Sequence, residues 1–579
     1  MPDKTSPSAV AASSKSYRKP PSGAADKPKS KTAKAATTAL SLKPNLAPKL
    51  KDIFEKAGFK HVPSDGLHFT IGGRKGELDH IFVWKNVVLL CEETAGKDAT
   101  KHCTNKIFLH AKIKEHWLEF FQQYTKQNTA LLTALGPEYQ VHDLEVRHIY
   151  YSEEIDVASS IGDPSPMLVL TRAQARYFKS LVDTIECSAK FELLKYLDIA
   201  LSQVGAERTS GNTVPLNRYT AFALSAAHTS YPPGFAVVSF YADPMALIQR
   251  AYVMRRDGWE SPDLSYQRFV KSDKLIKMRE YLAESGKVFI NNIVVTLPAA
   301  ALLLDSTGQV LDAKTMKNKA EIQLSLPLEL GTVGIVDGQH RILSYYEGAD
   351  QFDQAISSLR QRQNLLVTGI VFPANYTAEM RVKFEAEIFL AINNNQSPVH
   401  TQLRQDLETI INPETPLAIA RTIVSRLSKE GALADMLQMS QFDPSDKISS
   451  GSLGPYVVKP LVRKNSALYK TWDAASARNL SSPDDRADYI DYCVKELKRL
   501  LAGASEHLKS NWKSVPNGGV LSTTAVGGLL LLLDRLIKAG NVPANIDYKT
   551  VLKNITNFDF SAYTGSGWGK LSRDLEAAL

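Results

Sequence analysis

The sequence predicts a mixed α/β protein, with two α/β blocks followed by a mostly helical C-terminal region. Three observations predict this class. Of the 579 residues, 44% are apolar and 22% are charged, which is ordinary globular composition and excludes a fibrous, collagenous or wholly disordered chain. Short apolar runs of strand length alternate with segments of helical periodicity up to about residue 400. Helical periodicity dominates from there onward.

The first 45 residues form a low-complexity segment rich in Ser, Ala, Lys and Pro. Such a composition buries no core, so residues 1–45 are predicted to be a disordered basic tail. Residues 1–50 hold ten Lys and Arg residues and two acids, and therefore carry the whole net charge of +8. The other 529 residues hold 59 basic and 59 acidic groups, so the remainder is neutral. If the tail binds anything, we expect unspecific contact with a phosphate backbone.

Residues 46–210 form the first predicted block. Apolar spacing indicates a helix that ends at Gly58, two strands, a long helix, two more strands and a helical stretch. A loop-like stretch rich in Gly and Ser near residue 210 closes the block. The ranges expected after the first helix are His80–Trp84, Val87–Cys91, Asn105–Lys126, Arg147–Tyr151, Leu168–Leu170 and Arg172–Leu201.

Residues 215–420 form the second predicted block, and residues 421–579 form the helical region. The helix Ala525–Ile537 is expected in the core, the alternative being an interface between copies of the chain, so a homo-oligomer is left open. The ranges expected in the second block are Pro244–Arg255, Lys274–Leu282, Ile293–Leu297, Val333–Val336, Leu365–Phe372 and Ala378–Ile392.

An acid-rich hairpin is the first candidate site. If Lys85-Asn86 is a tight turn, Asp79 lies opposite Glu92 and Glu77 lies opposite Thr94, all on one face of the hairpin. Opposed Cβ atoms are about 4.5–5.5 Å apart, so two carboxylates repel unless a cation lies between them. Mg²⁺ is the natural cation for such a pair. The alternative is a set of surface acids at the strand ends.

This arrangement resembles the core of PD-(D/E)XK nucleases, in which an Asp and an (Asp/Glu)-x-Lys tripeptide hold Mg²⁺ that activates water for phosphodiester cleavage. The resemblance implies a restriction-endonuclease-like α/β domain over residues 46–210, with Asp79 and Glu92 as catalytic metal ligands and Glu77 and Thr94 beside them. Thr94 stands where the family usually has Lys. A lysine from elsewhere can take its place, and the candidates are Lys97, Lys101, Lys106 and Lys112.

The pentapeptide Asp337-Gly338-Gln339-His340-Arg341 is the second candidate site. It stands between a short apolar run and an apolar helix start, and strand, turn and helix N-terminus together suit anion capture. Asp337 is expected to cap the helix, Gly338 to let the backbone approach a phosphate, and Arg341 to supply a two-pronged donor. Gln339 and His340 add donors at the same turn. The alternative is a capped helix with an exposed polar first turn.

The pentapeptide is the signature of DGQHR-domain proteins, a family that includes the DndB-type proteins of DNA phosphorothioation systems, and the chain resembles that family over residues 215–420. Three further segments carry the resemblance: Tyr266-Gln267-Arg268, residues 289–293 and residues 389–399. It implies a ParB/sulfiredoxin-like α+β domain that binds a nucleotide or DNA phosphate through Asp337, Arg341 and Arg268, with Asn393 orienting them. Sulfiredoxins carry a Cys in this loop and Gln339 takes its place, which excludes reductase chemistry.

Several other classes are excluded by what the sequence lacks. The four cysteines show no CxxC or Cys/His zinc spacing, which favours a reducing compartment and a cytoplasmic location. The longest apolar run, near residues 526–533, is shorter than the ~20 residues of a membrane helix, so no membrane association is expected. Neither a Walker A motif, a helix-turn-helix nor a zinc finger is recognisable.

The leading hypothesis is a DNA-associated protein of bacterial DNA modification or anti-phage defence. It has a Mg²⁺-dependent nuclease domain and a loop that binds a nucleotide, with ATP, GTP and CTP not distinguished. DNA is the expected partner, with other defence or modification proteins beside it. The main alternative is a non-catalytic DNA-binding regulator, which Thr94 in place of Lys favours. A partition-like nucleotide switch is a third hypothesis.

Overall fold

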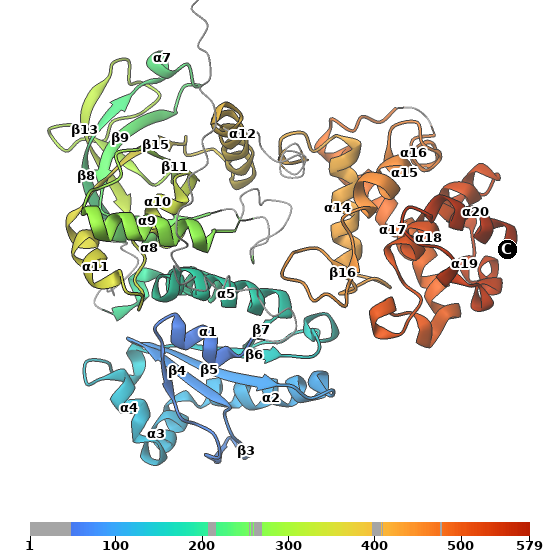
Figure 1. Ribbon diagram of the computed structural model, residues 1–579, viewed down its shortest axis with the longest axis horizontal. Helices are drawn as coiled ribbons and strands as arrows, with labels where there is room; N and C mark the ends of the chain where they lie inside the picture. Colours follow the sequence, from blue (N-terminus) through green and yellow to red (C-terminus); the bar gives the residue numbers. More distant parts are fainter. Residues whose placement is uncertain are drawn as a thin grey trace, which may run out of the picture. The chain divides into compact units, whose positions relative to one another are not determined.

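The computed structural model describes residues 48–205, 216–253, 255, 259, 269–396, 407, 409–474 and 477–579, and over these ranges the protein is mixed α/β, as predicted (Figure 1). The predicted tail and the Tyr266-Gln267-Arg268 segment lie outside the described residues. We refer below to an N-terminal block (48–205), a central block (216–396) and a C-terminal block (409–579).

A five-stranded sheet in the order β1-β4-β5-β6-β7 forms the N-terminal block. β1, β4 and β5 are antiparallel to one another, whereas β5, β6 and β7 run parallel. The strands are β1 (Lys60–Val62), β4 (His80–Trp84), β5 (Val87–Thr94), β6 (Glu145–Ser152) and β7 (Met167–Leu170), and a separate hairpin joins β2 (Phe69–Ile71) to β3 (Arg74–Gly76).

Helices cover both faces of this sheet (Figure 1). Alternate residues of β4 and β5 enter two different clusters: Phe82 and Leu89 pack towards the first group of helices, and Ile81 and Leu90 towards the second. Burial on both faces explains why these strands are continuous apolar runs. The first group is α1 (Leu50–Lys56), α5 (Arg172–Ile185) and α6 (Lys190–Tyr196), and the second is α2 (Ala99–Glu115), α3 (Trp117–Gln127) and α4 (Thr129–Leu135).

The β4–β5 hairpin has the predicted register, with His80 paired to Cys91 and Trp84 to Val87 around the turn. The prediction that Glu77 lies opposite Thr94 is wrong. Gly76 pairs with Phe69 in the β2–β3 hairpin, so the chain reaches the main sheet only at His80.

The single helix predicted over Asn105–Lys126 is two helices. His116, with φ −113° and ψ +38°, leaves the helical region between α2 and α3. The bend accompanies an aromatic cluster in which the rings of Phe120 and Tyr124 pack against Phe69 of β2 at centroid distances of 5.0 and 5.9 Å. Packing between elements, rather than helical periodicity, therefore sets this boundary.

An eight-stranded sheet in the order β10-β14-β11-β15-β9-β8-β13-β12 forms the central block. β14 pairs antiparallel with β11, which runs parallel to β15. The predicted strands at 293–297, 333–336 and 365–372 are all present. The strands are β8 (Leu216–Leu224), β9 (Ala236–Ala242), β10 (Ala251–Tyr252), β11 (Ile293–Leu297), β12 (Leu302–Leu304), β13 (Ala320–Pro327), β14 (Val333–Asp337) and β15 (Leu365–Val371).

The three helices predicted in the central block are all present, but their ends differ from the prediction: the second spans Ser272–Ser285, and the third continues past Ile392 to Gln396. The helix predicted over Pro244–Arg255 ends at Arg250, because Ala251 and Tyr252 pair in parallel with β14 as strand β10. Asp243 caps its start by accepting a hydrogen bond from the Ala246 N–H. The helices are α7 (Ala226–Thr229), α8 (Pro244–Arg250), α9 (Ser272–Ser285), α10 (Gln339–Leu343), α11 (Asp353–Arg362) and α12 (Ala378–Gln396).

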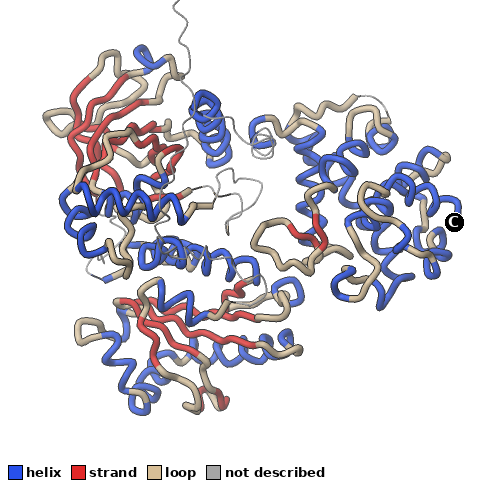
Figure 2. The backbone as a smooth tube through the Cα atoms, in the orientation of Figure 1, coloured by secondary structure: helices blue, strands red, loops and turns tan. Residues whose placement is uncertain are grey.

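The C-terminal block is helical apart from one short strand pair, as the tube in Figure 2 shows. The apolar helix predicted at Ala525–Ile537 is α18, and its leucines at 529, 530, 532 and 533 are buried in the block's core, as expected. The elements are α14 (Pro416–Lys429), β16 (Leu437–Gln438), β17 (Ile448–Ser449), α15 (Lys459–Val462), α16 (Ala467–Trp472), α17 (Pro483–Leu508), α18 (Thr523–Lys538), α19 (Tyr548–Val551) and α20 (Trp568–Ala578).

Candidate functional site

Glu92, near the end of β5, is the centre of a buried charged cluster. Its side chain is fully buried and lies on the face of β5 that packs against α2. Lys106 Nζ lies 2.6 Å from Glu92 Oε2, and His110 Nε2 lies 2.8 Å from Oε1. Lys106 and His110 are four residues apart on α2, so one face of the helix presents both to the carboxylate.

Asp79 approaches Glu92 from the residue before β4. Its Oδ2 accepts a hydrogen bond of 2.8 Å from the Glu93 N–H, which fixes the carboxylate at the open end of the hairpin. Burial raises the pKa of Glu92 well above its usual value, Lys106 opposes this shift, and the charge of Asp79 adds to it. The two acids predicted to face each other are therefore close enough to repel.

Lys106 is the one of the four candidate lysines that reaches the acids. Its side chain is 14% exposed, and Nζ also donates a hydrogen bond of 3.0 Å to the Glu77 carbonyl. Lys97 and Lys101 are exposed, and Lys112, which is half-buried, pairs with Glu115 instead. The ammonium group of Lys106, on α2, therefore lies beside Glu92, and Thr94 has no charged group to contribute there.

The side chains of Glu77 and Thr94 point to other partners. Glu77 Oε2 lies 3.5 Å from His68 Nδ1, and its side chain is about half exposed. Thr94 Oγ1 accepts a hydrogen bond of 3.1 Å from the Gly96 N–H. Of the four residues predicted for this site, the charged cluster therefore contains Asp79 and Glu92 and does not contain Glu77 and Thr94.

Two buried histidines behind Glu92 were missed by the sequence analysis. His110 Nδ1 lies 2.7 Å from Nδ1 of His148 on β6. Burial lowers the pKa of His110 well below its usual value, and that of His148 to about 4, so both rings are neutral at pH 7. The spacing of His110 from Lys106 was visible in the sequence, but the contact with His148 depends on the packing of α2 on the sheet.

Asp79 and Glu92 are the two carboxylates of this cluster that could hold a hard divalent cation. Among the described residues, no group of three or more His, Cys, Asp and Glu side chains is placed to hold a metal. Mg²⁺ is commonly bound by one or two carboxylates, with waters and substrate phosphates completing its shell. Asp79 and Glu92 fit that pattern, because a cation between them would relieve their mutual repulsion.

The pentapeptide at 337–341 has the predicted strand-turn-helix form. β14 ends at Asp337, Gly338 takes the left-handed φ of +101°, and α10 begins at Gln339. A Cβ at Gly338 would lie 3.0 Å from Arg341 Nη2 and 3.1 Å from Ile293 Cγ1. Both the backbone conformation and the close packing therefore require glycine here.

Asp337 does not cap α10, contrary to the prediction. Gly338 is the N-cap residue, and no side chain caps this helix. Asp337 Oδ2 instead accepts a hydrogen bond of 2.8 Å from Arg341 Nη2, which also donates to the Asn292 carbonyl at 2.9 Å. Two buried atoms of the loop, Arg341 Nε and Gln339 Oε1, have no hydrogen-bond partner among the described residues.

His340 is a neutral member of this loop. Its Nε2 accepts a hydrogen bond of 3.3 Å from the Lys271 N–H, and burial together with Lys274 and Lys271 lowers its pKa to about 4. Positive charge at the loop therefore comes from Arg341. Of the other predicted ligands, Arg268 lies outside the described residues, and Asn393 belongs to α12 but its side chain is not described.

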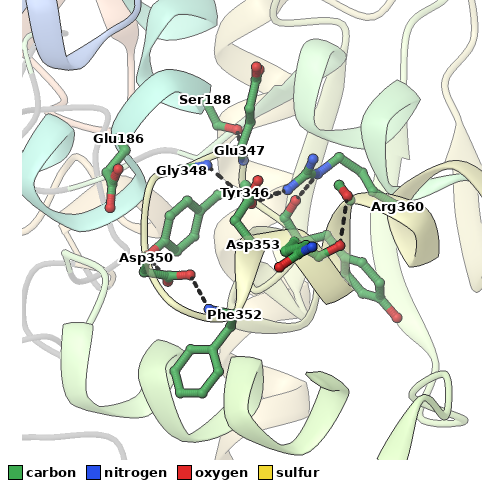
Figure 3. A network of polar contacts seen from close by, with 12 residues as sticks. Glu186, Ser188, Tyr346, Glu347, Gly348, Asp350, Phe352, Asp353 and Arg360 are labelled. Carbon is green, nitrogen blue, oxygen red and sulfur yellow. Dashed lines mark hydrogen bonds and ion pairs between the residues drawn. The ribbon is translucent and has the colours of Figure 1, made fainter. Parts of the chain in front are cut away.

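A polar network holds the chain that follows α10 (Figure 3). Arg279 of α9 is fully buried and donates to both carboxylate oxygens of Asp350, at 2.6 and 2.8 Å, and to the Ser344 and Tyr346 carbonyls. Arg360 donates to the Tyr346 carbonyl at 2.7 Å and to Asp353 at 2.6 Å. These contacts fix the C-terminal end of α10 and thereby position the loop before it.

The N-terminal block contributes to the same network. Ser188 Oγ accepts a hydrogen bond of 2.9 Å from the Glu347 N–H (Figure 3). Glu186 Oε2 accepts one of 2.7 Å from the Ala349 N–H. Leu343 and Tyr346 also belong to the apolar cluster built on α1 and α5. The end of α10 is therefore packed directly against the N-terminal block.

Comparisons with protein-family models, with curated proteins and with solved structures each give no match for this chain. Among the helices of the described residues, none combines the length and the apolar character that crossing a membrane requires.

Proposed function

We propose that this protein acts on DNA as a metal-dependent deoxyribonuclease, with Asp79, Glu92 and Lys106 as its active centre and the 337–341 loop as a nucleotide- or DNA-phosphate-binding element. The observation that carries the proposal is the convergence of two acids and one lysine at the open end of the β4–β5 hairpin. Lys106 supplies from α2 the ammonium group that the resemblance to PD-(D/E)XK nucleases places two residues after Glu92.

Each residue of the centre has a distinct task in this proposal. Asp79 and Glu92 hold a divalent cation such as Mg²⁺, which when bound polarises the scissile phosphate and lowers the pKa of water. The positive charge of Lys106 stabilises the negative charge that develops on the phosphate oxygens in the transition state. His110, neutral and fully buried, donates to Glu92 Oε1 and keeps that carboxylate oriented.

Arg341 is the proposed phosphate ligand of the central block. The ion pair with Asp337 orients the planar guanidinium group at the turn. Its Nε–H has no hydrogen-bond partner among the described residues and is the donor that we assign to a phosphate oxygen. Because α10 has only five residues, the side chain rather than the helix end supplies the affinity. We propose bacterial DNA modification or anti-phage defence as the biological setting, because both require proteins that recognise DNA, and defence also requires its cleavage.

The second candidate function is a DNA-binding regulator that does not cleave. The contact between Lys106 and Glu92 favours it, because a buried ion pair already neutralises the carboxylate that would hold the cation. Binding of DNA would then depend on groups such as Arg341 and the basic N-terminal segment, and not on the Glu92 cluster.

A DNA cleavage assay separates the two functions. We expect the full chain to cut plasmid or phage DNA in Mg²⁺ or Mn²⁺ and to lose all cleavage when EDTA removes the metal, because two carboxylates alone offer no Lewis acid. Gel shift in EDTA measures DNA binding on the same sample. Intact DNA under every metal and nucleotide condition, together with a retained gel shift, would establish the regulator instead.

A further inference from the structure

A cavity of about 900 Å³ opens between α9 and the chain that leads into β11. It lies outside the Glu92 cluster, and no step of the proposed nuclease reaction uses it. Its principal lining side chains are Lys274, Lys277, Met278, Tyr281, Lys287 and Phe289.

The cavity is basic, with three lysines among its described lining residues. Lys274 and Lys277 lie three residues apart on α9 and Tyr281 four further on, so one helix face presents all three. Lys287 faces them from the following segment. None of the described residues that line the cavity is acidic, and no described carboxylate forms an ion pair with any of the three lysines. Such a wall attracts an anion.

An aromatic stack forms the apolar part of the wall. The rings of Tyr281 and Phe289 are stacked with centroids 5.6 Å apart and planes 25° apart. Tyr281 is 45% exposed, and the neighbouring Ile290 is 87% exposed. An exposed aromatic ring on a rigid stack is a platform on which a further planar ring can stack.

The cavity adjoins the 337–341 loop. Asn291 lines the cavity, and the carbonyl of the next residue, Asn292, accepts a hydrogen bond from Arg341. At the other end, the N–H of Lys271 donates to His340 only three residues before Lys274. The cavity and the 337–341 loop are therefore neighbours on the central block, joined through Asn292 and Lys271.

We propose that this cavity binds single-stranded nucleic acid, with an unpaired base stacked on Tyr281 and the adjoining backbone phosphates against Lys274, Lys277 and Lys287. A duplex keeps the faces of its bases inside the stack, whereas a single strand can place a base face on an aromatic ring, so the aromatic wall favours a single strand. The proposal goes beyond nuclease activity and does not depend on it, because binding requires no metal.

Fluorescence anisotropy with the full chain in EDTA tests the proposal. We expect a labelled single-stranded oligonucleotide to bind more tightly than its duplex, and Tyr281→Ala to weaken the single strand by about tenfold. Tyr281→Phe keeps the ring and should keep the affinity. The triple variant Lys274→Ala/Lys277→Ala/Lys287→Ala should lower the slope of log affinity against log salt concentration by about two.

A matched control removes the same charge elsewhere. Lys314, Lys317 and Lys319 are exposed on the loop between β12 and β13, and their triple alanine variant should bind as the wild type does. Equal affinity of Tyr281→Ala and wild type for the single strand would overturn the proposal. Full competition by a free mononucleotide at the oligonucleotide's own affinity would also overturn it, because the site would then be one for a small molecule. Because EDTA is present throughout, these outcomes are independent of whether the protein cleaves DNA.

Discussion

Replacing Lys106 by Met is expected to lower metal-dependent DNA cleavage by about 100- to 1000-fold. Lys106 Nζ is the cationic group nearest to Glu92, 2.6 Å from Oε2, and loss of one well-placed donor from a transition state commonly costs that factor. The rate of plasmid nicking under single-turnover conditions measures the effect. The loss should appear in kcat rather than in DNA affinity, because one lysine contributes little to the total phosphate contacts.

Lys112→Met is the matched control for this variant. Lys112 lies on the same helix six residues later, and its half-exposed side chain pairs with Glu115 rather than with Glu92, so its replacement should leave cleavage unchanged. Thermal unfolding of both variants shows whether the fold is kept. If folded Lys106→Met cleaves at the wild-type rate, Lys106 has no catalytic role and the proposed centre is wrong.

Replacing Arg279 by Met is expected to destabilise the segment around α10 by about 3–5 kcal/mol. Arg279 is fully buried and lies 3.7 Å from the centre of the Tyr346 ring. Its removal takes the guanidinium partner from Asp350 and one hydrogen-bond donor each from the Ser344 and Tyr346 carbonyls, of which the Tyr346 carbonyl keeps Arg360. Breaking one partner of a buried ion pair typically costs this much. Hydrogen exchange of the β14 and α10 amides measures the local opening free energy, and exchange should become faster by two to four powers of ten, roughly.

Arg362→Met is the control for the buried arginine. Arg362 is exposed on α11, and replacing a surface side chain of this kind should change stability by no more than about 0.5 kcal/mol. Equal exchange rates in Arg279→Met and wild type would show that the contacts of Arg279 with Asp350 and the Ser344 and Tyr346 carbonyls do not hold the loop.

The β4–β5 hairpin could be predicted from the sequence because the residues that determine it are neighbours in the chain. Two apolar runs of strand length with a two-residue turn fix the register, and the register alone places Asp79 beside Glu92. The choice of Lys106 among four lysines could not be predicted, because it depends on which face of α2 packs against β5. The contact between His110 and His148 joins residues 38 positions apart, and no local pattern encodes it.

In the 337–341 loop, too, the local structure could be predicted from the sequence and the side-chain contacts could not. Its strand, turn and helix follow from the apolar runs around a glycine, and all three are present. The partner of Asp337 could not be predicted, because the positive φ of Gly338 makes glycine the N-cap and leaves the aspartate facing Arg341. The contacts that fix the end of α10 come from α5, α9 and α11 and the segments beside them, which lie far apart in the chain.

Mn²⁺ binding to the metal-free full chain shows whether Asp79 and Glu92 form a metal centre, and it requires no knowledge of the DNA substrate. Electron paramagnetic resonance measures bound against free Mn²⁺, and we expect a site that Glu92→Gln abolishes and that Glu77→Gln leaves intact. Glu77 is the fitting control, since its carboxylate faces His68 outside the cluster. If Mn²⁺ binds equally well to wild type and Glu92→Gln, or does not bind at all, then Asp79 and Glu92 do not form a metal centre.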